Sequence, residues 1–438
     1  RWKGFPTFGV AWHLGEEEFI KRLGFISLIK IRYSWGQSGN APSGTSPYIG
    51  TFEAVTPGYG DMNAVKPASP DLTHLKYETI TSNNIGVDFG LFSDKVNFTF
   101  ELYKKVTDDL LQKKMKVPSS TGLSTVAWYN SGKIQNKGWE FNIDIAAVKT
   151  KDWSFNFGFN ISQNKNEILE LPENKNDELY TFGNKNYAYS VMMGDPLGSF
   201  YGYRYKGVYQ NVEETYAVNT SGQRILDIDG NPVVMKNGDQ KVYPGDARYE
   251  DVNGDGVIDE NDIVYLGNSN PTLTGGLNFT LRYKKVSLVA AFHGRAGQKV
   301  INQARMDMEN MRGKNNQSVA VLRRWRSEGD DTDIPRALYD KGYNYLGSDR
   351  FVEDASFLRL KTVTLKYQMP AKWMKAIGVN KLELYATGYD MFVWTKYKGQ
   401  DPEVNLKAAN DGTVAQVAID SNNTPKPFKI AFGLNLNF

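Results

Sequence analysis

The last ten residues, Lys429–Phe438, read KIAFGLNLNF and decide the fold. Large apolar residues occupy the even positions, and small or polar residues occupy the odd ones. Because side chains alternate across a strand, this pattern predicts a strand with one apolar face. Such a strand aggregates unless it is paired and its face is covered, and a closed transmembrane barrel provides both. The residues expected to face lipid are Ile430, Phe432, Leu434 and Leu436, and those expected to face a wet lumen are Lys429, Asn435 and Asn437.

Composition agrees with an all-β transmembrane antiparallel β-barrel. Aromatic residues make up 13% of the 438 residues, yet mean hydropathy is −0.49. This combination is typical of a barrel with a polar interior and aromatic girdles, although a soluble sandwich or carbohydrate-binding module remains the alternative. No apolar run reaches the roughly 18 residues of a membrane-spanning helix. The absence of cysteine excludes disulfides and Cys-based zinc sites, and a net charge of +3 does not indicate a nucleic-acid partner.

Period-two alternation recurs along the chain and predicts about 13 strands. In the strand Phe357–Tyr367 the alternation shifts by one residue between Leu360 and Val363, which predicts a β-bulge. The predicted strands are 9–14, 28–36, 85–91, 96–102, 139–145, 153–161, 186–193, 200–209, 277–283, 286–292, 357–367, 382–387 and 429–438.

Connection lengths support this count and its parity. Outer-membrane barrels alternate short periplasmic turns with long extracellular loops. Two long connections around the single strand Phe200–Tyr209 would break that alternation, so we expect Asn186–Met193 to form an additional strand paired with it. An odd number of strands cannot close an antiparallel barrel, so the count also predicts that further strands lie upstream of Arg1.

The long connections contain two further features. Ile301, Ala304, Met308 and Met311 recur at helical spacing and predict a helix over about Val300–Arg312, ended by Gly313. Its narrow apolar face most simply packs against neighbouring loops. The stretch Arg323–Arg326, which includes Trp325, would suit an anionic ligand, but a solvated or salt-paired loop is the simpler interpretation.

The segment Asp251–Asp262 has the spacing of a calcium-binding loop. Oxygen-bearing side chains stand at loop positions 1, 3, 5, 9 and 12, and Gly256 stands at position 6 for the sharp turn. Position 12 is Asp rather than Glu, and the alternative is an Asx-rich turn that bonds its own backbone. The residues predicted to hold Ca²⁺ are Asp251, Asn253, Asp255, Val257 through its carbonyl, Asp259 and Asp262.

Catalytic motifs are missing from the sequence. The three histidines, His13, His74 and His293, are scattered, and neither HExxH nor GxSxG occurs. Carboxylates such as Asp88 and Glu101 fall on the polar faces of predicted strands, where charged residues line any wet barrel. We therefore expect no enzymatic activity.

Motifs spread over nearly the whole chain resemble the carboxy-terminal part of SusC/RagA-like TonB-dependent outer-membrane transporters. The resemblance implies the outer membrane of a Gram-negative bacterium and a 22-stranded barrel, so that about nine strands would lie upstream. The family's plug and TonB-contacting segment have no counterpart in this sequence. The matching stretches are Phe5–Trp12, Ile29–Asn40, Pro70–Leu72 with Leu75–Glu78, Gly138–Phe141, Gly194–Tyr203, Asp251–Asp262, Ser356–Lys361 and the terminal Phe438.

The resemblance also implies a function and its partners. Members of the family import oligosaccharides or peptides with energy from the TonB complex, which they contact through the amino-terminal part. A SusD-like surface lipoprotein acts as a lid over the extracellular loops, and outer-membrane lipid surrounds the barrel. Tyr201, Tyr203 and Tyr205 would then stack on sugars or, more simply, lie at the membrane interface. A structural or adhesive barrel without transport remains the alternative function.

Overall fold

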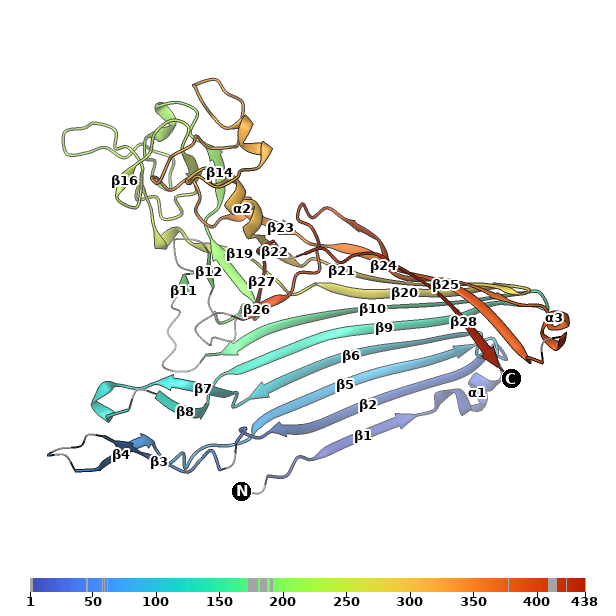
Figure 1. The fold of residues 1–438 in the computed structure, drawn as a ribbon. Helices are drawn as coiled ribbons and strands as arrows, with labels where there is room; N and C mark the ends of the chain where they lie inside the picture. Colours follow the sequence, from blue (N-terminus) through green and yellow to red (C-terminus); the bar gives the residue numbers. More distant parts are fainter. Residues whose placement is uncertain are drawn as a thin grey trace.

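A computed structural model gives the fold of the chain (Figure 1). It describes residues 3–437 except 45, 57, 59, 61, 124, 172–179, 182–186, 190–191, 377, 409–415 and 423. Among these residues, no helix has the length and apolar composition needed to cross a membrane.

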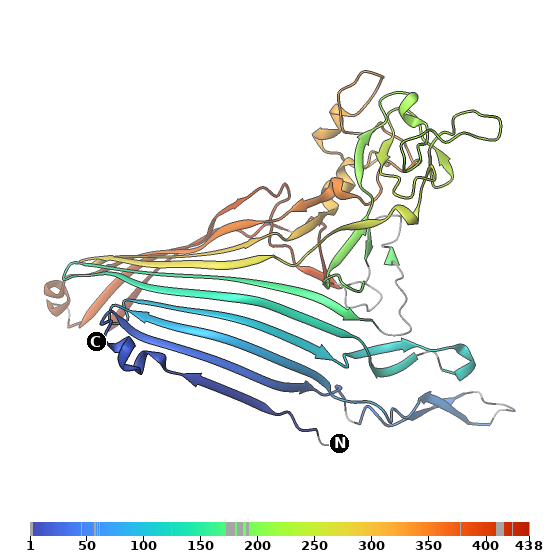
Figure 2. The same cartoon turned by 180° about the vertical axis from the view of Figure 1, so that it is seen from behind.

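Eleven strands form one large curved sheet, which Figures 1 and 2 show from its two sides. Every neighbouring pair in this sheet is antiparallel, and β1 and β28 are its two edges. The strands, in spatial order, are β1 (Thr7–Trp12), β2 (Ile26–Asn40), β5 (Glu78–Leu91), β6 (Val96–Asp108), β9 (Lys133–Lys149), β10 (Trp153–Glu170), β20 (Leu273–Tyr283), β21 (Val286–Ala296), β24 (Phe357–Gln368), β25 (Lys381–Thr395) and β28 (Lys429–Asn437).

The register confirms the alternation predicted for the terminal strand. Residues directly opposite each other share a face of the sheet. Phe432 lies opposite Ala386, which lies opposite Leu365, and Phe432 is 82% exposed. Asn435 lies opposite Glu383 on the other face. The sheet therefore has one apolar face, here called the outer face, and one polar face, here called the inner face.

The predicted bulge in β24 is confirmed. Phe292 pairs with Leu360, whereas the preceding Ala291 pairs with Thr362, so Lys361 is the extra residue. If Lys361 paired in the ladder instead of bulging, the apolar residues after it would turn to the inner face. The bulge thus keeps Leu360 and Val363 on the same outer face.

The predicted count of about 13 barrel strands is wrong, because two of them lie outside the large sheet. Within Asn186–Met193, the described residues form β12 (Ala188–Tyr189), in which Ala188 does pair with Tyr201 of β13 (Ser199–Gly202). These strands belong to a separate four-stranded sheet, β11 (Tyr180–Thr181), β12, β13 and β19 (Val264–Asn268). All four residues of β13 are buried, whereas a lipid-facing strand would expose every second residue.

The loop-length argument for an added strand fails with this correction. The remainder of Phe200–Tyr209 forms β14 (Tyr205–Val208), which pairs with β17 (Ala247–Tyr249) away from the large sheet. The whole connection from β10 to β20 is therefore a single long one. Short and long connections then alternate across the eleven strands with no strand added, and the long ones gather at one end (Figure 1).

Short elements organise the connections. Two hydrophobic clusters lie among the long ones, one around Phe200, Ile301 and Phe351 and the other around Tyr209, Ile258 and Leu346. We call the long connections together the loop assembly. The remaining strands are β3 (Thr51–Val55), β4 (Ala64–Ser69), β7 (Leu111–Lys116), β8 (Thr125–Asn130), β15 (Lys236–Asn237), β16 (Gln240–Lys241), β18 (Val257–Ile258), β22 (Lys299–Asn302), β23 (Val352–Asp354), β26 (Leu406–Ala408) and β27 (Gln416–Asp420). The helices are α1 (Glu18–Lys21), α2 (Gln303–Glu309) and α3 (Ala371–Ala376), with 3-10 turns at Leu14–Glu16, Ser119–Thr121, Glu213–Thr215, Glu260–Asp262, Val319–Arg323 and Asp349–Phe351.

The helix predicted over Val300–Arg312 exists but is shorter, and its face differs. Val300 and Ile301 belong to β22, where Ile301 pairs with Ile419 and Val352. Strand pairing therefore overrides helical spacing at this position. The Asn302 side chain accepts a hydrogen bond from the Arg305 N–H and caps α2, which ends at Glu309 rather than near Gly313. Its buried residues are Ala304, Met306 and Glu309, whereas Met308 is 39% exposed.

Candidate functional site: the inner face and the loop-assembly cavity

The inner face of the large sheet carries charged residues that pair with one another. Arg32 lies between Asp88, at 3.2 Å, and Glu101, and Asn84 donates a hydrogen bond to Glu101 at 3.0 Å. Asp144 shares this face and lies opposite Asn97 and Gly158. The structure thus brings Asp88 and Glu101 together around a guanidinium, an arrangement that belongs to a wet wall.

A buried ion network joins this face to the connection between β25 and β28. Arg359 of β24 is only 3% exposed and donates to the Asp401 carboxylate at 2.6 Å. Lys426 and Lys361 reach Glu403 at 2.7 Å and 3.2 Å. Burial alone would raise the pKa of Glu403, but these two lysines outweigh it and lower the pKa to about 2. The network anchors a long connection to the barrel wall.

Nothing in the local sequence pattern predicted this network. Arg359 and Lys361 have the spacing of residues that share a strand face, but their carboxylate partners follow some forty positions later. The bulge at Lys361 was visible in the sequence, whereas its pairing with Glu403 depends on how the β25–β28 connection folds back.

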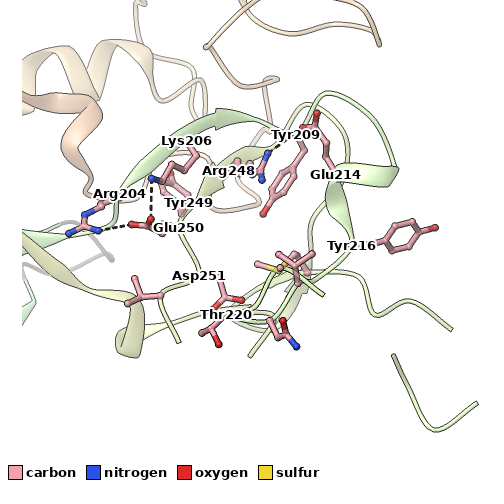
Figure 3. Close-up of a pocket in the computed structure, with 15 residues that line it drawn as sticks. Arg204, Lys206, Tyr209, Glu214, Tyr216, Thr220, Arg248, Tyr249, Glu250 and Asp251 are labelled. Atoms are coloured by element: carbon pink, nitrogen blue, oxygen red, sulfur yellow. Dashed lines mark hydrogen bonds and ion pairs between the residues drawn. The ribbon is translucent and has the colours of Figure 1, made fainter. Parts of the chain in front are cut away.

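The loop assembly contains a cavity of about 690 Å³ (Figure 3). One face of the β14–β17 ribbon forms a wall of it and carries charges of both signs. Glu250 accepts from Arg204 at 2.9 Å and from Lys206 at 3.1 Å, and Arg248 lies 3.6 Å from Glu214. Burial acts to raise the pKa of Glu250, but Lys206 and Arg204 together lower it below its ordinary value. The cavity is therefore lined by ionised groups at neutral pH.

The opposite face of the same ribbon holds it in place. Tyr249 is 3% exposed. Its hydroxyl donates to the Tyr343 carbonyl at 3.1 Å and accepts from the Leu346 N–H at 3.1 Å. Burial raises the pKa of Tyr249 well above its ordinary value. Alternation in a two-stranded ribbon thus places tyrosines in the core and charges in the cavity.

The tyrosines proposed for sugar stacking lie elsewhere than predicted. Tyr201 and Tyr203 are 4% and 8% exposed and belong to the interior of the loop assembly. The Tyr201 hydroxyl donates to Asp195 at 2.6 Å, and the Tyr205 hydroxyl donates to the Asp333 carbonyl at 2.5 Å. They form neither a stacking platform nor a membrane-interface girdle. This run of aromatic residues belongs to a buried ribbon. Its alternation is the same as that of a barrel strand, so the sequence alone could not separate the two.

The predicted calcium loop lies in the loop assembly, and its side chains bond its own backbone. Asp251 accepts from the N–H groups of Gly254 at 2.7 Å and Gly256 at 2.8 Å. Asp262, fully buried, accepts from Val252 at 2.7 Å and from Asp259 at 2.9 Å. Asp255 accepts from the Val257 N–H and the Asn253 amide, and Asp259 accepts from the Asn261 N–H.

These contacts are those of the Asx-turn alternative. Within the described ranges, no three His, Cys, Asp or Glu side chains gather closely enough to hold a metal ion. Carboxylate and amide oxygens are suitable ligands for Ca²⁺, but the carboxylates of this loop point to its own N–H groups and do not converge on one point. The calcium site stays a prediction.

The arginine-rich stretch also bonds its own backbone. Arg324 donates to the Val321 carbonyl at 3.4 Å and Arg326 to the Leu322 carbonyl at 3.0 Å. The backbone N–H of Trp325 donates to the Ile334 carbonyl at 2.8 Å. These contacts fit the simpler interpretation of a solvated loop.

Comparison with known proteins decides the family. The family described as TonB dependent receptor-like, beta-barrel matches residues 1–232, more than half of the chain. The chain belongs to this family of TonB-dependent receptor β-barrels. The family's place is the outer membrane, so the outer face of this TonB-dependent barrel sheet is its lipid face and the inner face is its lumen wall.

Individual relatives agree and show how much of them the chain covers. TonB-dependent receptor P3 of Formosa agariphila is 30% identical over 99% of this chain and 42% of its own length. TonB-dependent receptor SusC of Bacteroides thetaiotaomicron is 27% identical over 100% of this chain and 40% of its own. The chain thus spans about two-fifths of these relatives, which are receptors rather than enzymes, as expected.

A solved structure supports the same fold. The structure of the RagAB peptide transporter aligns with a TM-score of 0.75 at 23% identity, over 99% of this chain and 43% of that one. Together with SusC, this confirms the SusC/RagA-like resemblance and the barrel class.

Proposed function

We propose that the protein imports large polar nutrients, oligosaccharides or peptides, across the outer membrane by TonB-dependent transport. The observation that carries this proposal is the two-sided sheet, with apolar rows on one face and ion pairs such as Arg32–Asp88 on the other. Such a wall lines an aqueous path through lipid. A lumen as wide as that of the largest outer-membrane transporters needs a plug, and release of the solute past it needs energy.

The loop-assembly cavity supports a role in contacting the solute and favours peptides. Its wall presents Arg204, Lys206 and Arg248 beside Glu214 and Glu250. A peptide carries charges of both signs and can exchange with these ion pairs, whereas a neutral oligosaccharide cannot. Of the three lining tyrosines, Tyr209 and Tyr249 are 2% and 3% exposed, and the half-buried ring of Tyr216 lies against the Arg224 guanidinium, 5.1 Å away.

A SusD-like surface lipoprotein is the proposed partner. The β3–β4 hairpin, at the end where the long connections gather, leaves Phe52 and Val65 71% and 73% exposed (Figure 1). Apolar side chains of this exposure are typical of a surface that a partner covers. A lid over the loop assembly would enclose a captured solute.

Uptake by whole cells tests the proposal and separates it from an adhesive barrel. We expect labelled peptides to enter cells that carry the full-length protein and an intact TonB, and to stay outside when TonB is deleted. Replacing Lys206 and Arg248 with glutamine should lower uptake at least about tenfold, because each removes a charge-assisted contact. The exposed Lys314→Gln is the control and should leave uptake unchanged. Surface binding without TonB-dependent entry would favour the adhesive alternative.

A further inference from the structure

Three lysines stand in one row across the outer face of the large sheet. Lys104 of β6 lies directly opposite Lys137 of β9, and Lys137 lies directly opposite Lys165 of β10. In the same register, Leu102 lies opposite Trp139, which lies opposite Gln163. The lysines therefore share the face of the apolar rows and lie one step nearer to the long connections.

This alignment is unfavourable for the protein alone. Like charges directly opposite each other destabilise a sheet, because their Cβ atoms are only about 5 Å apart. In the described part of the chain, the one carboxylate within 4 Å of the three ammonium groups is Glu167, at 3.8 Å from Lys137 and 3.7 Å from Lys165. The row thus carries an excess of two positive charges. Lysines that only extend toward water have no need of such an alignment.

A groove of about 510 Å³ adjoins the row and gives it a second, apolar wall. Ile85, Leu102 and Trp139 line this groove together with the three lysines. Tyr33 lies opposite Ile85 in the same row, so on β5, β6 and β9 the apolar band gives way to Asn83 and the lysines one step further along. In a barrel, this boundary lies at the level of the lipid head groups.

We propose that the groove binds a phosphorylated lipid of the outer leaflet, with phosphate on the lysine row and acyl chains over Ile85, Leu102 and Trp139. Lysine is a common phosphate ligand. Glu167 compensates only one of the three ammonium charges, so the remaining two match the two negative charges of a phosphate. The long connections are the extracellular ones in this family, so the row faces the outer leaflet. The site is separate from the lumen and from the cavity proposed to contact the solute.

Native mass spectrometry of the full chain in detergent, titrated with diphosphorylated lipid A, tests the proposal. Replacing Lys104, Lys137 and Lys165 together with glutamine should weaken binding about 100-fold, since each lysine near an anionic lipid surface contributes about fivefold. Lipid A without phosphates should bind the wild-type protein as weakly as phosphorylated lipid A binds the triple variant. Inorganic phosphate at millimolar concentration should not displace the lipid, because it lacks the acyl chains.

Lys105→Gln is the matched control. Lys105 neighbours Lys104 on β6 but lies on the inner face, opposite Asn136, so its replacement should leave lipid binding unchanged. Without lipid, the triple variant should melt at the same or a higher temperature, because a repulsion has been removed, whereas a purely structural role predicts a lower one. Equal lipid A binding by the wild type and the triple variant would overturn the proposal. Displacement by inorganic phosphate, or an equal loss in Lys105→Gln, would also overturn it.

Discussion

The large sheet and the loop assembly are built by opposite rules. In the sheet, the outer face is apolar over most of its length, so Phe432 is 82% exposed although it belongs to a regular strand. In the two hydrophobic clusters of the loop assembly, apolar residues turn inward as in a soluble domain, and Phe200 is fully buried. The comparison teaches that exposure of apolar side chains has opposite meanings in the two regions of one chain.

The two regions meet at the Arg359 network, and Arg359→Ala should have the largest effect. Removing the guanidinium leaves Asp401 buried without its partner, which costs about 3–5 kcal/mol. We expect a matching loss in the free energy of unfolding and faster hydrogen exchange around Asp401. Lys366→Ala, on the same strand, breaks only a long contact of 3.8 Å to Glu383, which keeps Lys381 as a second partner, and should change little. Equal effects of the two variants would show that the network does not anchor the connection.

Ile143→Lys tests the rule of the sheet. Ile143 lies between Phe98 and Phe159 on the outer face, well inside β9. A lysine there should cost about 2–4 kcal/mol in a lipid bilayer. Phe432→Lys, on the outer face of the edge strand β28, should also destabilise the protein in lipid. Asn142→Lys, on the inner face, is the control, and unfolding in liposomes would measure all three.

Acid should loosen the loop assembly from the sheet through Glu403. The pKa of Glu403 is lowered from 4.5 to about 2 by folding, so its contribution is complete above pH 4.5 and is lost as pH falls toward 2. The contribution is up to about 3 kcal/mol. Hydrogen exchange of residues 396–408 across this window would measure it. In Glu403→Gln this part of the pH dependence should disappear, and its persistence would assign the effect to other carboxylates.

Calcium should have the smallest effect, confined to the loop assembly. If Asp251–Asp262 binds Ca²⁺ with a Kd of about 10⁻⁴–10⁻³ M, 1 mM calcium stabilises the protein by roughly 1 kcal/mol. Thermal melting with and without calcium, beside Asp255→Ala, would detect this. An identical melting temperature in both conditions would leave the self-bonded turn as the full account of the loop.

Prediction from the sequence succeeded where alternation of apolar and polar residues arises only from a strand with one face toward lipid. The strands of the sheet, the bulge at Lys361 and the faces of Lys429–Phe438 follow from alternation alone. Phe200–Tyr209 also looked like a barrel strand, because a buried ribbon and a lipid-facing strand share aromatic residues. Likewise, Ile301 matched a helical face but pairs in β22, since long-range pairing overrides local spacing. The partners of Arg359 and Glu250 depend on how the connections fold back, which local patterns do not encode.

Scanning β9 with single cysteines tests the central claim, that one face of the sheet meets lipid and the other meets water. The chain has no cysteine of its own, so each introduced thiol reports one position. In liposomes, a fluorophore at positions 139, 141, 143 and 145 should be quenched by brominated lipid, while thiols at 140, 142 and 144 should react with a charged, membrane-impermeant reagent. Equal labelling and quenching at adjacent positions would contradict the account.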